Sequence, residues 1–290
     1  MRPDTNLGER ISALLGADVV SLSRIQSRGY TTALHAIADL DDGRRVFVKA
    51  GTEEVTSGFL RDEIKVYRAV GAAPFMPAFH GADERDPPIL VLEDLSNCFS
   101  APPWTDSKIA AVLALVEELR ATPAPAELGS AERYRADWTG RWDRVAADPE
   151  PFLALALCSR EWLAGALPTL SAAADAAPLG GEVLVHTDIR SDNLAFLDSR
   201  AKLVDWNWAS AGHPKLDLAC WLPSLHAEGG PPPEALMPEG GVEIAAMLAG
   251  VWGAAAGLPP PPTAPNVRAA QLTQLRVALP WAARELGLPL

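Results

Sequence analysis

The stretch LVHTDIRSDNLAF, residues 184–196, places one histidine, two aspartates, one arginine and one asparagine between two apolar runs. Further along, AKLVD ends a second short apolar segment at Asp205. Short apolar runs next to turn-forming residues are typical of buried strands. The pattern therefore predicts strands that enter and leave a core, with hydrogen-bonding side chains collected in the loops between them.

These polar side chains meet the requirements of phosphoryl transfer. That chemistry needs a carboxylate near the attacking hydroxyl, oxygen ligands for Mg²⁺ and cations that hold the phosphates. Asp188 supplies a carboxylate, Asn193 an amide oxygen five residues later, and Asp205 a second carboxylate. Oxygen atoms are the ligands that magnesium prefers in proteins. Taken singly, each of these residues is also a common turn former.

The composition narrows the class of protein and its partners. At 290 residues, the chain is long enough for one large domain or two lobes. Its 48% apolar and 21% charged residues are typical of a soluble globular protein. A formal net charge of −12 argues against nucleic acid and anionic membranes as partners, because both repel acidic surfaces. A cationic small molecule would be attracted.

The cysteines and the apolar segments favour a cytoplasmic protein. Cys98, Cys158 and Cys220 are an odd number and form no CxxC pair, so neither a disulfide framework nor a zinc site is indicated. The first residues contain scattered charges and no apolar signal region, and no later stretch is apolar enough to span a bilayer. We therefore expect a reducing cytosol as its location.

The first third of the chain has the pattern of a small antiparallel sheet that carries one helix. Extended segments cover 18–27 and 31–40, and Asp-Asp-Gly at 41–43 predicts a hairpin into the strand 44–50. A helix is expected over 56–71, with Thr or Ser as its cap and Gly71 at its end. Another strand pair turns at 86–88.

From residue 105 the pattern becomes helical, with one strand-rich insertion at 182–209. Helices are expected over about 105–120, 130–147 and 151–176, and the last two helices over roughly 240–285. All nine tryptophans lie from Trp104 onward. We predict an α+β fold with an N-terminal lobe at 1–94 and a mainly helical C-terminal lobe at 95–290.

The polar motif resembles that of a known family of kinases. His186, Asp188 and Asn193 reproduce HxDxxxxN, and Asp205 stands where a metal-binding Asp follows in aminoglycoside phosphotransferases and their choline-kinase-like relatives. The resemblance implies a bilobal protein-kinase-like fold, with Asp188 as the catalytic base and Asn193 and Asp205 as Mg²⁺ ligands. It also implies that Arg190 lies near the transferred phosphate, although a salt bridge that shapes the loop is an alternative for Arg190.

Lys49 and Glu63 supply a separate indication. In VFVK the side chains alternate, so Lys49 shares a face of its strand with Phe47. Glu63 falls within an apolar stripe of the following helix, where an unpaired carboxylate would cost several kcal/mol. Lys49 is its expected partner, and a simple surface ion pair is the alternative. The two residues resemble the lysine and glutamate that hold the α- and β-phosphates of ATP in this superfamily.

The resemblance implies two further nucleotide contacts. Backbone amides around Gly29, Tyr30 and Thr31 would contact phosphate in a reduced version of the glycine-rich loop. The segment ILVLEDLS looks like the linker between lobes, with the backbone of Glu93, Asp94 and Leu95 reading the adenine edge. ATP is the expected cofactor with Mg²⁺, and GTP is left open.

Two departures from the protein-kinase pattern point to a small acceptor. Trp206 and Asn207 stand where protein kinases have Phe and Gly after the metal-binding Asp. Eleven residues separate Asp205 from Asp217, and no APE motif follows, so an activation segment that seats a peptide is missing. The resemblance gives Asp217 a structural role, as a buttress of the catalytic loop.

The sequence predicts a phosphotransferase that moves the γ-phosphate of ATP to a hydroxyl of an aminoglycoside, an amino sugar or a similar small molecule. Two alternatives stay open, namely a catalytically inactive nucleotide-binding pseudokinase and a kinase of a choline-type or amino-acid-type metabolite. The acidic charge favours a cationic acceptor. Residues that contact the acceptor are expected in the last two helices.

Overall fold

The computed structural model describes residues 3–25, 33–262 and 264–288 of the chain, with side chains from residue 7 onward. Two compact units can be distinguished. Residues up to Ser100 together with Asp192–Ala209 form one, which we call the strand-rich unit. Ala101–Ser191 together with Ser210–Leu290 form the other, the helical unit. The functional division into lobes at residue 94 remains a proposal.

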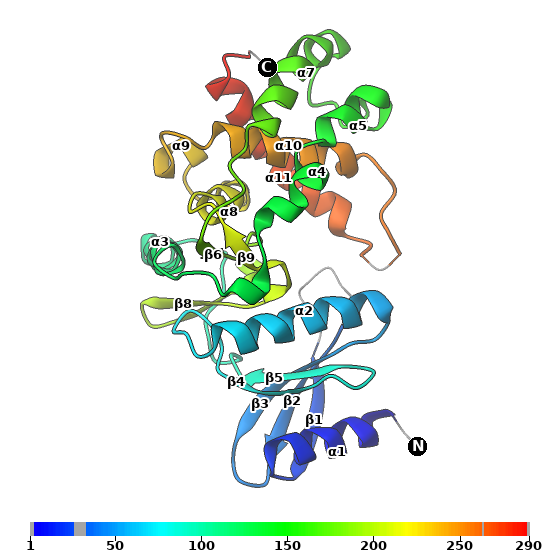
Figure 1. The fold of residues 1–290 in the computed structure, drawn as a ribbon, viewed down its shortest axis with the longest axis vertical. Helices are drawn as coiled ribbons and strands as arrows, with labels where there is room; N and C mark the ends of the chain where they lie inside the picture. The colour runs from blue at the N-terminus through cyan, green and yellow to red at the C-terminus, as the bar shows by residue number, and fades with distance from the viewer. Residues whose placement is uncertain (1–2, 26–32, 263, 289–290) are drawn as a thin grey trace. The chain divides into compact units, whose positions relative to one another are not determined.

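An antiparallel sheet is the centre of the strand-rich unit (Figure 1). Its order is β1-β2-β3-β5-β4, with bounds β1 Val19–Ile25, β2 Leu34–Leu40, β3 Arg45–Ala50, β4 Phe79–Asp83 and β5 Ile89–Glu93. The predicted Asp-Asp-Gly turn is confirmed, since Gly43 joins β2 to β3 with φ of 85°, a conformation that glycine adopts without a steric penalty. In this register His35 lies opposite Lys49, and Ile37 opposite Phe47.

Helices cover both faces of this sheet. On one face α1, Pro3–Leu15, contributes Leu7 and Ile11 to a core that also contains Ala36, Val46 and Val48. This helix was not predicted from the sequence. Residues that alternate with these, such as Phe47 and Lys49, point to the opposite face.

The second helix, α2, spans Glu54–Val70 and ends at Gly71, as predicted. The expected Thr or Ser cap was wrong, because Glu53 is the cap residue and Thr56 lies three positions inside the helix. There the Thr56 hydroxyl accepts a hydrogen bond from Glu53 N at 3.1 Å, which completes a capping box. The helix packs on the face of the sheet opposite α1, which we call the inner face. There the Tyr67 ring stacks on Phe79 with 5.8 Å between centroids.

A short hairpin, β7 Leu194–Leu197 and β8 Arg200–Leu203, also belongs to the strand-rich unit. It is followed by the single turn η4, Trp206–Trp208. Trp206 is fully buried, packs 5.7 Å from the ring of Phe75 and donates from Nε1 to Leu203 O at 2.7 Å. Trp206 therefore fixes the turn that directly follows Asp205.

The helical unit contains most of the remaining elements. They are α3 Asp106–Arg120, η1 Ala126–Leu128, η2 Ala131–Tyr134, α4 Arg135–Trp138, α5 Arg141–Ala147, α6 Glu150–Leu153, α7 Arg160–Asp175, β6 Val183–Val185, β9 Ser210–Gly212, α8 Leu216–Ala227, α9 Pro233–Leu236, α10 Val242–Ala256 and α11 Val267–Glu285. The turn η3, Ser191–Asn193, joins the two units.

The long helices predicted for 130–147 and 151–176 are interrupted. Pro149 and Pro151 flank the start of the single-turn α6, and Ser159 caps a new helix by accepting from Trp162 N at 3.1 Å. The apolar periodicity was correct, but these breaks divide the segments into shorter helices.

Trp142 anchors the core of the helical unit. Its side chain is fully buried, lies 5.8 Å from the ring of Phe152 and donates from Nε1 to Ala246 O of α10 at 2.8 Å. A Cβ atom at Gly250 would lie 2.8 Å from this indole nitrogen, so the glycine leaves the room that the tryptophan fills.

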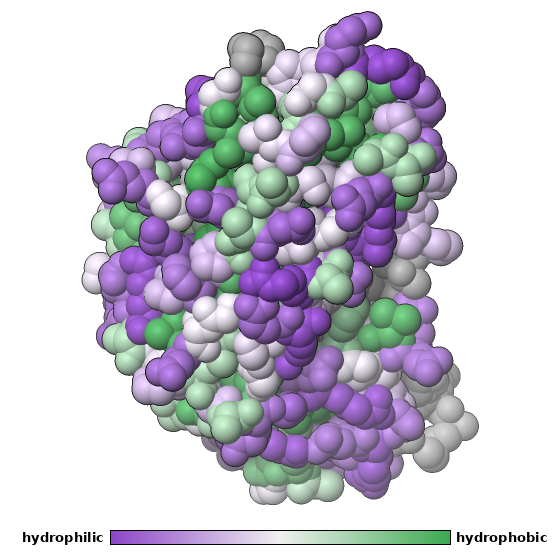
Figure 2. Space-filling view, turned by 45° about the horizontal axis from the view of Figure 1, so that its top comes forward, coloured by the Kyte–Doolittle hydropathy of each residue, from purple (hydrophilic) through white to green (hydrophobic). Residues whose placement is uncertain are grey.

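On the face drawn in Figure 2, hydrophilic residues cover much of the surface and hydrophobic residues form separate patches. The large exposed apolar side chains among the described residues are far apart in the sequence and include Val20, Val55, Phe99 and Leu258. Within the part of the chain that the structure describes, no helix has the length and apolar character needed to cross a membrane.

Replacing Trp142 by alanine should lower the free energy of unfolding by about 3–5 kcal/mol, because a fully buried aromatic ring would be lost. The half-buried Trp162 provides a matched control, whose change to alanine should cost clearly less. Denaturant unfolding followed by circular dichroism measures both values. Equal losses for the two variants would contradict the role assigned to Trp142.

Candidate active site

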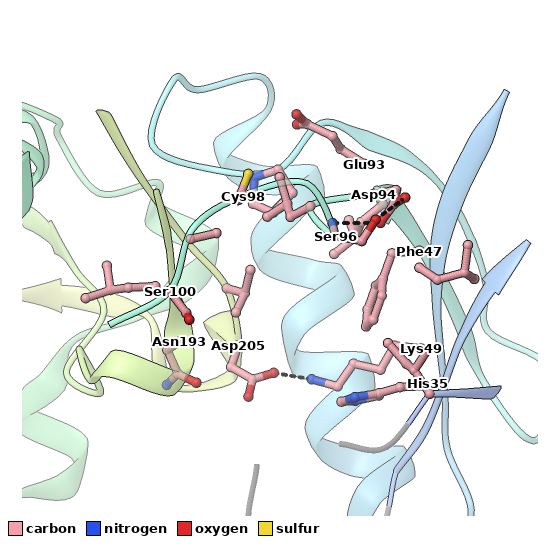
Figure 3. Close-up of a pocket in the computed structure, with 18 of the residues that line it drawn as sticks. His35, Phe47, Lys49, Glu93, Asp94, Ser96, Cys98, Ser100, Asn193 and Asp205 are labelled. Atoms are coloured by element: carbon pink, nitrogen blue, oxygen red, sulfur yellow. Dashed lines mark hydrogen bonds and ion pairs between the residues drawn. The ribbon is translucent and has the colours of Figure 1, made fainter. Parts of the chain in front are cut away.

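A cavity of about 490 Å³ opens on the inner face of the sheet in the strand-rich unit (Figure 3). One wall comes from the strands and includes His35, Phe47 and Lys49. The others come from the segment 93–100 and from residues 192–195 and 204–205. Cavities of this size are typical of small-molecule sites.

Lys49 lies between two carboxylates of this unit. Its Nζ is 2.7 Å from Glu63 Oε2 and also pairs with Asp205 Oδ1 (Figure 3 shows the pair with Asp205). The side chains of Lys49 and Glu63 are 13% and 2% exposed, so the two residues form a buried pair rather than a surface one. Glu63 also accepts a hydrogen bond from the backbone N–H of Trp206.

The electrostatics of this group keep the lysine charged. Burial lowers the pKa of Lys49, but the charges of Asp205 and Glu63 more than offset this effect, and the pKa is raised. Burial raises the pKa of Glu63, and Lys49 opposes that shift. The arrangement provides a fixed ammonium group in a cavity that a small molecule can enter.

Asn193 and Asp205 are brought together by the chain that carries them. Val204 N donates to Asn193 O at 3.0 Å, and Figure 3 draws both side chains on the wall that faces Lys49 and His35. Asp205 has φ of 64°, a left-handed conformation that aspartate tolerates better than most residues. Both residues offer oxygen atoms, which suits Mg²⁺. Among the described residues, no group of three or more His, Cys, Asp and Glu side chains could hold a metal. A cation held by Asn193 and Asp205 would therefore also bind oxygen atoms of a bound small molecule.

Asp188 and Arg190 belong to the helical unit. Arg190 Nη1 lies 2.7 Å from Asp188 Oδ1, with 17% and 29% of the two side chains exposed. His186 is fully buried, and its Nδ1 accepts from Asp188 N at 3.2 Å. His186 is therefore part of the hydrogen-bonded structure of the loop. The ion pair supports the alternative of a loop-shaping Arg190, and its contact with phosphate remains a prediction.

Asp217 of α8 holds the backbone of the same loop. Its carboxylate accepts from His186 N at 3.0 Å and from Thr187 N at 2.6 Å. Thr187 has φ of 64°, which is unusual for a β-branched residue and needs such support. Burial raises the pKa of Asp217 to about 6, although these two N–H groups act against the rise.

The segment predicted to read adenine lines the cavity through Glu93, Asp94 and Leu95. The Glu93 N–H donates to Ala78 O at 2.9 Å, and Leu95 O accepts from Cys98 N at 3.0 Å. Lys202 pairs with the Glu93 carboxylate, and Ser96 N donates to Asp94 at 2.9 Å. The predicted phosphate contacts at Gly29, Tyr30 and Thr31 lie outside the described residues.

Two of these residues were not predicted from the sequence. His35 lines the cavity beside Lys49 and Phe47, and strand alternation could have indicated it. In the helical unit, Glu228 accepts from Ser191 Oγ at 2.6 Å and from Trp104 Nε1 at 2.8 Å. No local pattern could have predicted this contact, because Glu228 is 37 residues from Ser191 and 124 from Trp104.

The model of the phosphotransferase enzyme family matches residues 37–258 of the chain. The chain belongs to this family. The predicted resemblance is confirmed, and so is the assignment of the protein as a phosphotransferase. No curated protein matches the chain significantly.

Several solved structures share the fold of this chain at low sequence identity. A thermostable mutant of aminoglycoside phosphotransferase APH(4)-Ia, in a ternary complex with AMP-PNP and hygromycin B, is 17% identical with a TM-score of 0.60, over 98% of this chain and all of the other. A choline/ethanolamine kinase family protein from Mesorhizobium loti is 15% identical with a TM-score of 0.61, covering 97% of this chain and 98% of its own. A macrolide 2′-phosphotransferase type I is 18% identical with a TM-score of 0.55, covering 99% and 93%. These similarities confirm the predicted α+β, kinase-like fold.

The raised pKa of Asp217 predicts a loss of stability between about pH 4 and pH 6. The carboxyl has a pKa near 3.9 in the unfolded chain and about 6 in the folded one, so the folded state binds more protons in this interval. The unfolding free energy contributed by this group therefore falls as pH rises, by roughly 2–3 kcal/mol, and levels off above about pH 7.

Asp217→Asn cannot ionise and should lack this decrease. Denaturant unfolding of the wild type and the variant at several values between pH 4 and pH 7 measures the difference, with the exposed Asp148→Asn as a control. Parallel pH profiles for the wild type and Asp217→Asn would contradict the assignment.

Proposed function

We propose that this protein transfers the γ-phosphate of ATP to a hydroxyl group of a small molecule. The observation that carries the proposal is the buried pair of Lys49 and Glu63, which Asp205 joins at the cavity. A charged lysine that two carboxylates hold in a cavity is suited to a polyphosphate, because phosphate oxygens can take over part of its pairing.

The nucleotide would lie along the inner face of the sheet. Phe47, Ile37 and Leu92 supply an apolar wall for a purine ring. The adenine edge would bind the Glu93 carbonyl and the Leu95 N–H, because Ala78 and Cys98 already engage the Glu93 N–H and the Leu95 carbonyl. GTP stays open as an alternative to ATP, and phosphate contacts at residues 29–31 remain part of the proposal.

Asn193 and Asp205 are the proposed residues for Mg²⁺, together with phosphate oxygens of the nucleotide. The ion would neutralise charge on the β- and γ-phosphates. Asp205 now pairs with Lys49, so binding of a cation would divide the charge of this carboxylate between two partners. The amide of Asn193 adds an oxygen ligand and no charge.

Asp188 is the proposed catalytic base. It would accept the proton of the acceptor hydroxyl as that oxygen attacks the γ-phosphorus, and the bond from the phosphorus to the β–γ bridging oxygen breaks. Arg190 fixes the Asp188 carboxylate at 2.7 Å, and Asp217 fixes the loop backbone. The inactive pseudokinase is the alternative, and an assay of γ-phosphate transfer with several acceptors distinguishes the two.

For the acceptor we propose a molecule that carries an amine. The net charge of −12 disfavours an anionic acceptor. In addition, the half-buried Glu228 is hydrogen-bonded to Ser191, which lies three residues after Asp188. Three residues of extended chain span at most about 11 Å, so the Cα atom of Ser191 lies no farther than that from the Cα atom of Asp188. Hygromycin B and choline/ethanolamine kinase appear in the names of structural relatives, which supports a range of acceptors for this fold.

The change Asp188→Asn should lower kcat by about a hundredfold or more, because the amide cannot accept the hydroxyl proton. Nucleotide affinity should stay within about twofold of the wild type. Steady-state kinetics and calorimetric binding of AMP-PNP measure the two effects. Asp198→Asn, in the exposed turn between β7 and β8, is the control. Unchanged turnover in Asp188→Asn would remove this residue from the mechanism.

An amine on the acceptor should lower KM relative to the matching alcohol, and raising the salt concentration should increase KM more than it lowers kcat. Glu228→Gln should remove much of this preference, whereas Glu127→Gln, an exposed change in the same unit, should keep it. The measurement compares one sugar with its amino-sugar analogue at two ionic strengths. Equal KM values that do not depend on salt would rule out the proposed preference.

A further inference from the structure

His35 is a cavity residue next to Lys49. The two lie opposite each other on β2 and β3, and directly opposed residues of antiparallel strands have Cβ atoms about 4.5–5.5 Å apart. Figure 3 shows the imidazole beside the Lys49 side chain, on the wall across from Asp205 and Asn193. The ring packs edge-on against Phe47, with 5.3 Å between centroids.

One ring nitrogen of His35 lacks a hydrogen bond. Nε2 is buried, and no group among the described residues pairs with it. Buried polar atoms of native proteins nearly always have a partner, and exceptions often mark functional positions. Burial and the charge of Lys49 lower the pKa of His35 to about 4, although the charge of Asp205 acts in the opposite direction. The neutral imidazole therefore has one N–H donor and one acceptor at neutral pH.

The order of residues across the sheet indicates which part of a ligand would meet this nitrogen. Ile37, Phe47 and Leu92 lie opposite one another and form one row of the inner face. This row is next to Glu93, where the proposed adenine-binding segment Glu93–Leu95 begins. His35 and Lys49 form the next row, one step further from the linker. A nucleotide with its base at the linker row and its anionic end at Lys49 would bring phosphate oxygens, rather than the base, to His35.

We propose that His35 Nε2 donates a hydrogen bond to a phosphate oxygen of the bound nucleotide, and that His35 and Lys49 together form the phosphate-binding pair of the sheet. This inference rests on the proposed function. The ring lines the cavity and is only half-buried, so a turn of the side chain presents Nε2 to a ligand. A histidine that merely fills space at this position would make no such bond.

The test compares nucleotide and nucleoside. Binding of AMP-PNP with Mg²⁺, and of adenosine, is measured by calorimetry for the wild type, His35→Phe and His35→Leu. Phe and Leu fill the position with an apolar side chain that has no hydrogen-bond donor. We therefore expect about tenfold weaker binding of AMP-PNP and unchanged binding of adenosine. His35→Gln, which retains a donor, should recover part of the affinity. His80→Phe, an exposed change on β4, is the matched control.

Each result either supports or overturns the inference. Full AMP-PNP affinity in His35→Phe or His35→Leu would overturn it, as would equal weakening of adenosine, which would assign the contact to the nucleoside. If His35→Phe does not fold, judged by its circular dichroism spectrum, the Leu variant gives the answer. Absence of AMP-PNP binding to the wild-type chain would instead contradict the proposed function itself.

Discussion

The ion pair between Lys49 and Glu63 is the contact on which the cavity side of the strand-rich unit depends. It connects the sheet to α2 at a point where the carboxylate is 2% exposed. A charge buried to this extent is stable only with a partner, and removal of one member of such a pair typically costs about 3–5 kcal/mol. The pair thus fixes both the position of the helix and that of an ammonium group. Glu63 extends the connection to the Trp206 backbone, next to Asp205.

The two faces of the sheet differ in function: one packs against α1 and the other lines the cavity. Small and branched residues such as Ala36, Val46 and Val48 pack under α1. The alternate positions, among them His35, Phe47 and Lys49, line the cavity. A shift of one residue in the register of β3 would exchange the two sets and bury Lys49 beneath α1. The tight turn at Gly43 therefore contributes to the site through the register that it sets.

Local patterns in the sequence were sufficient for the strands, for α2 and for the pairing of Lys49 with Glu63, because alternation and helical spacing determine which face each side chain occupies. They were insufficient for α1, whose segment carries scattered charges. They also failed at the cap of α2, where Thr56 acts from inside the helix rather than from its end. Glu228 could not be predicted because its partners are distant in sequence and meet it only after folding. The roles of Asp188, Asn193 and Asp205 were inferred from a family motif rather than from packing.

The discontinuous composition of the strand-rich unit has a consequence for biosynthesis. Its sheet is complete once Glu93 has been made. Asp192–Ala209, which supply Trp206 and Asp205, follow only after Ala101–Ser191 of the helical unit. During translation at about 5–20 residues per second, the sheet therefore waits for several seconds with the surface around Phe75 uncovered. In that interval Lys49 has Glu63 but not yet Asp205. A nascent chain thus acquires the contacts of its carboxylate-lined cavity late, and a truncated product that ends before residue 192 would contain the sheet without them.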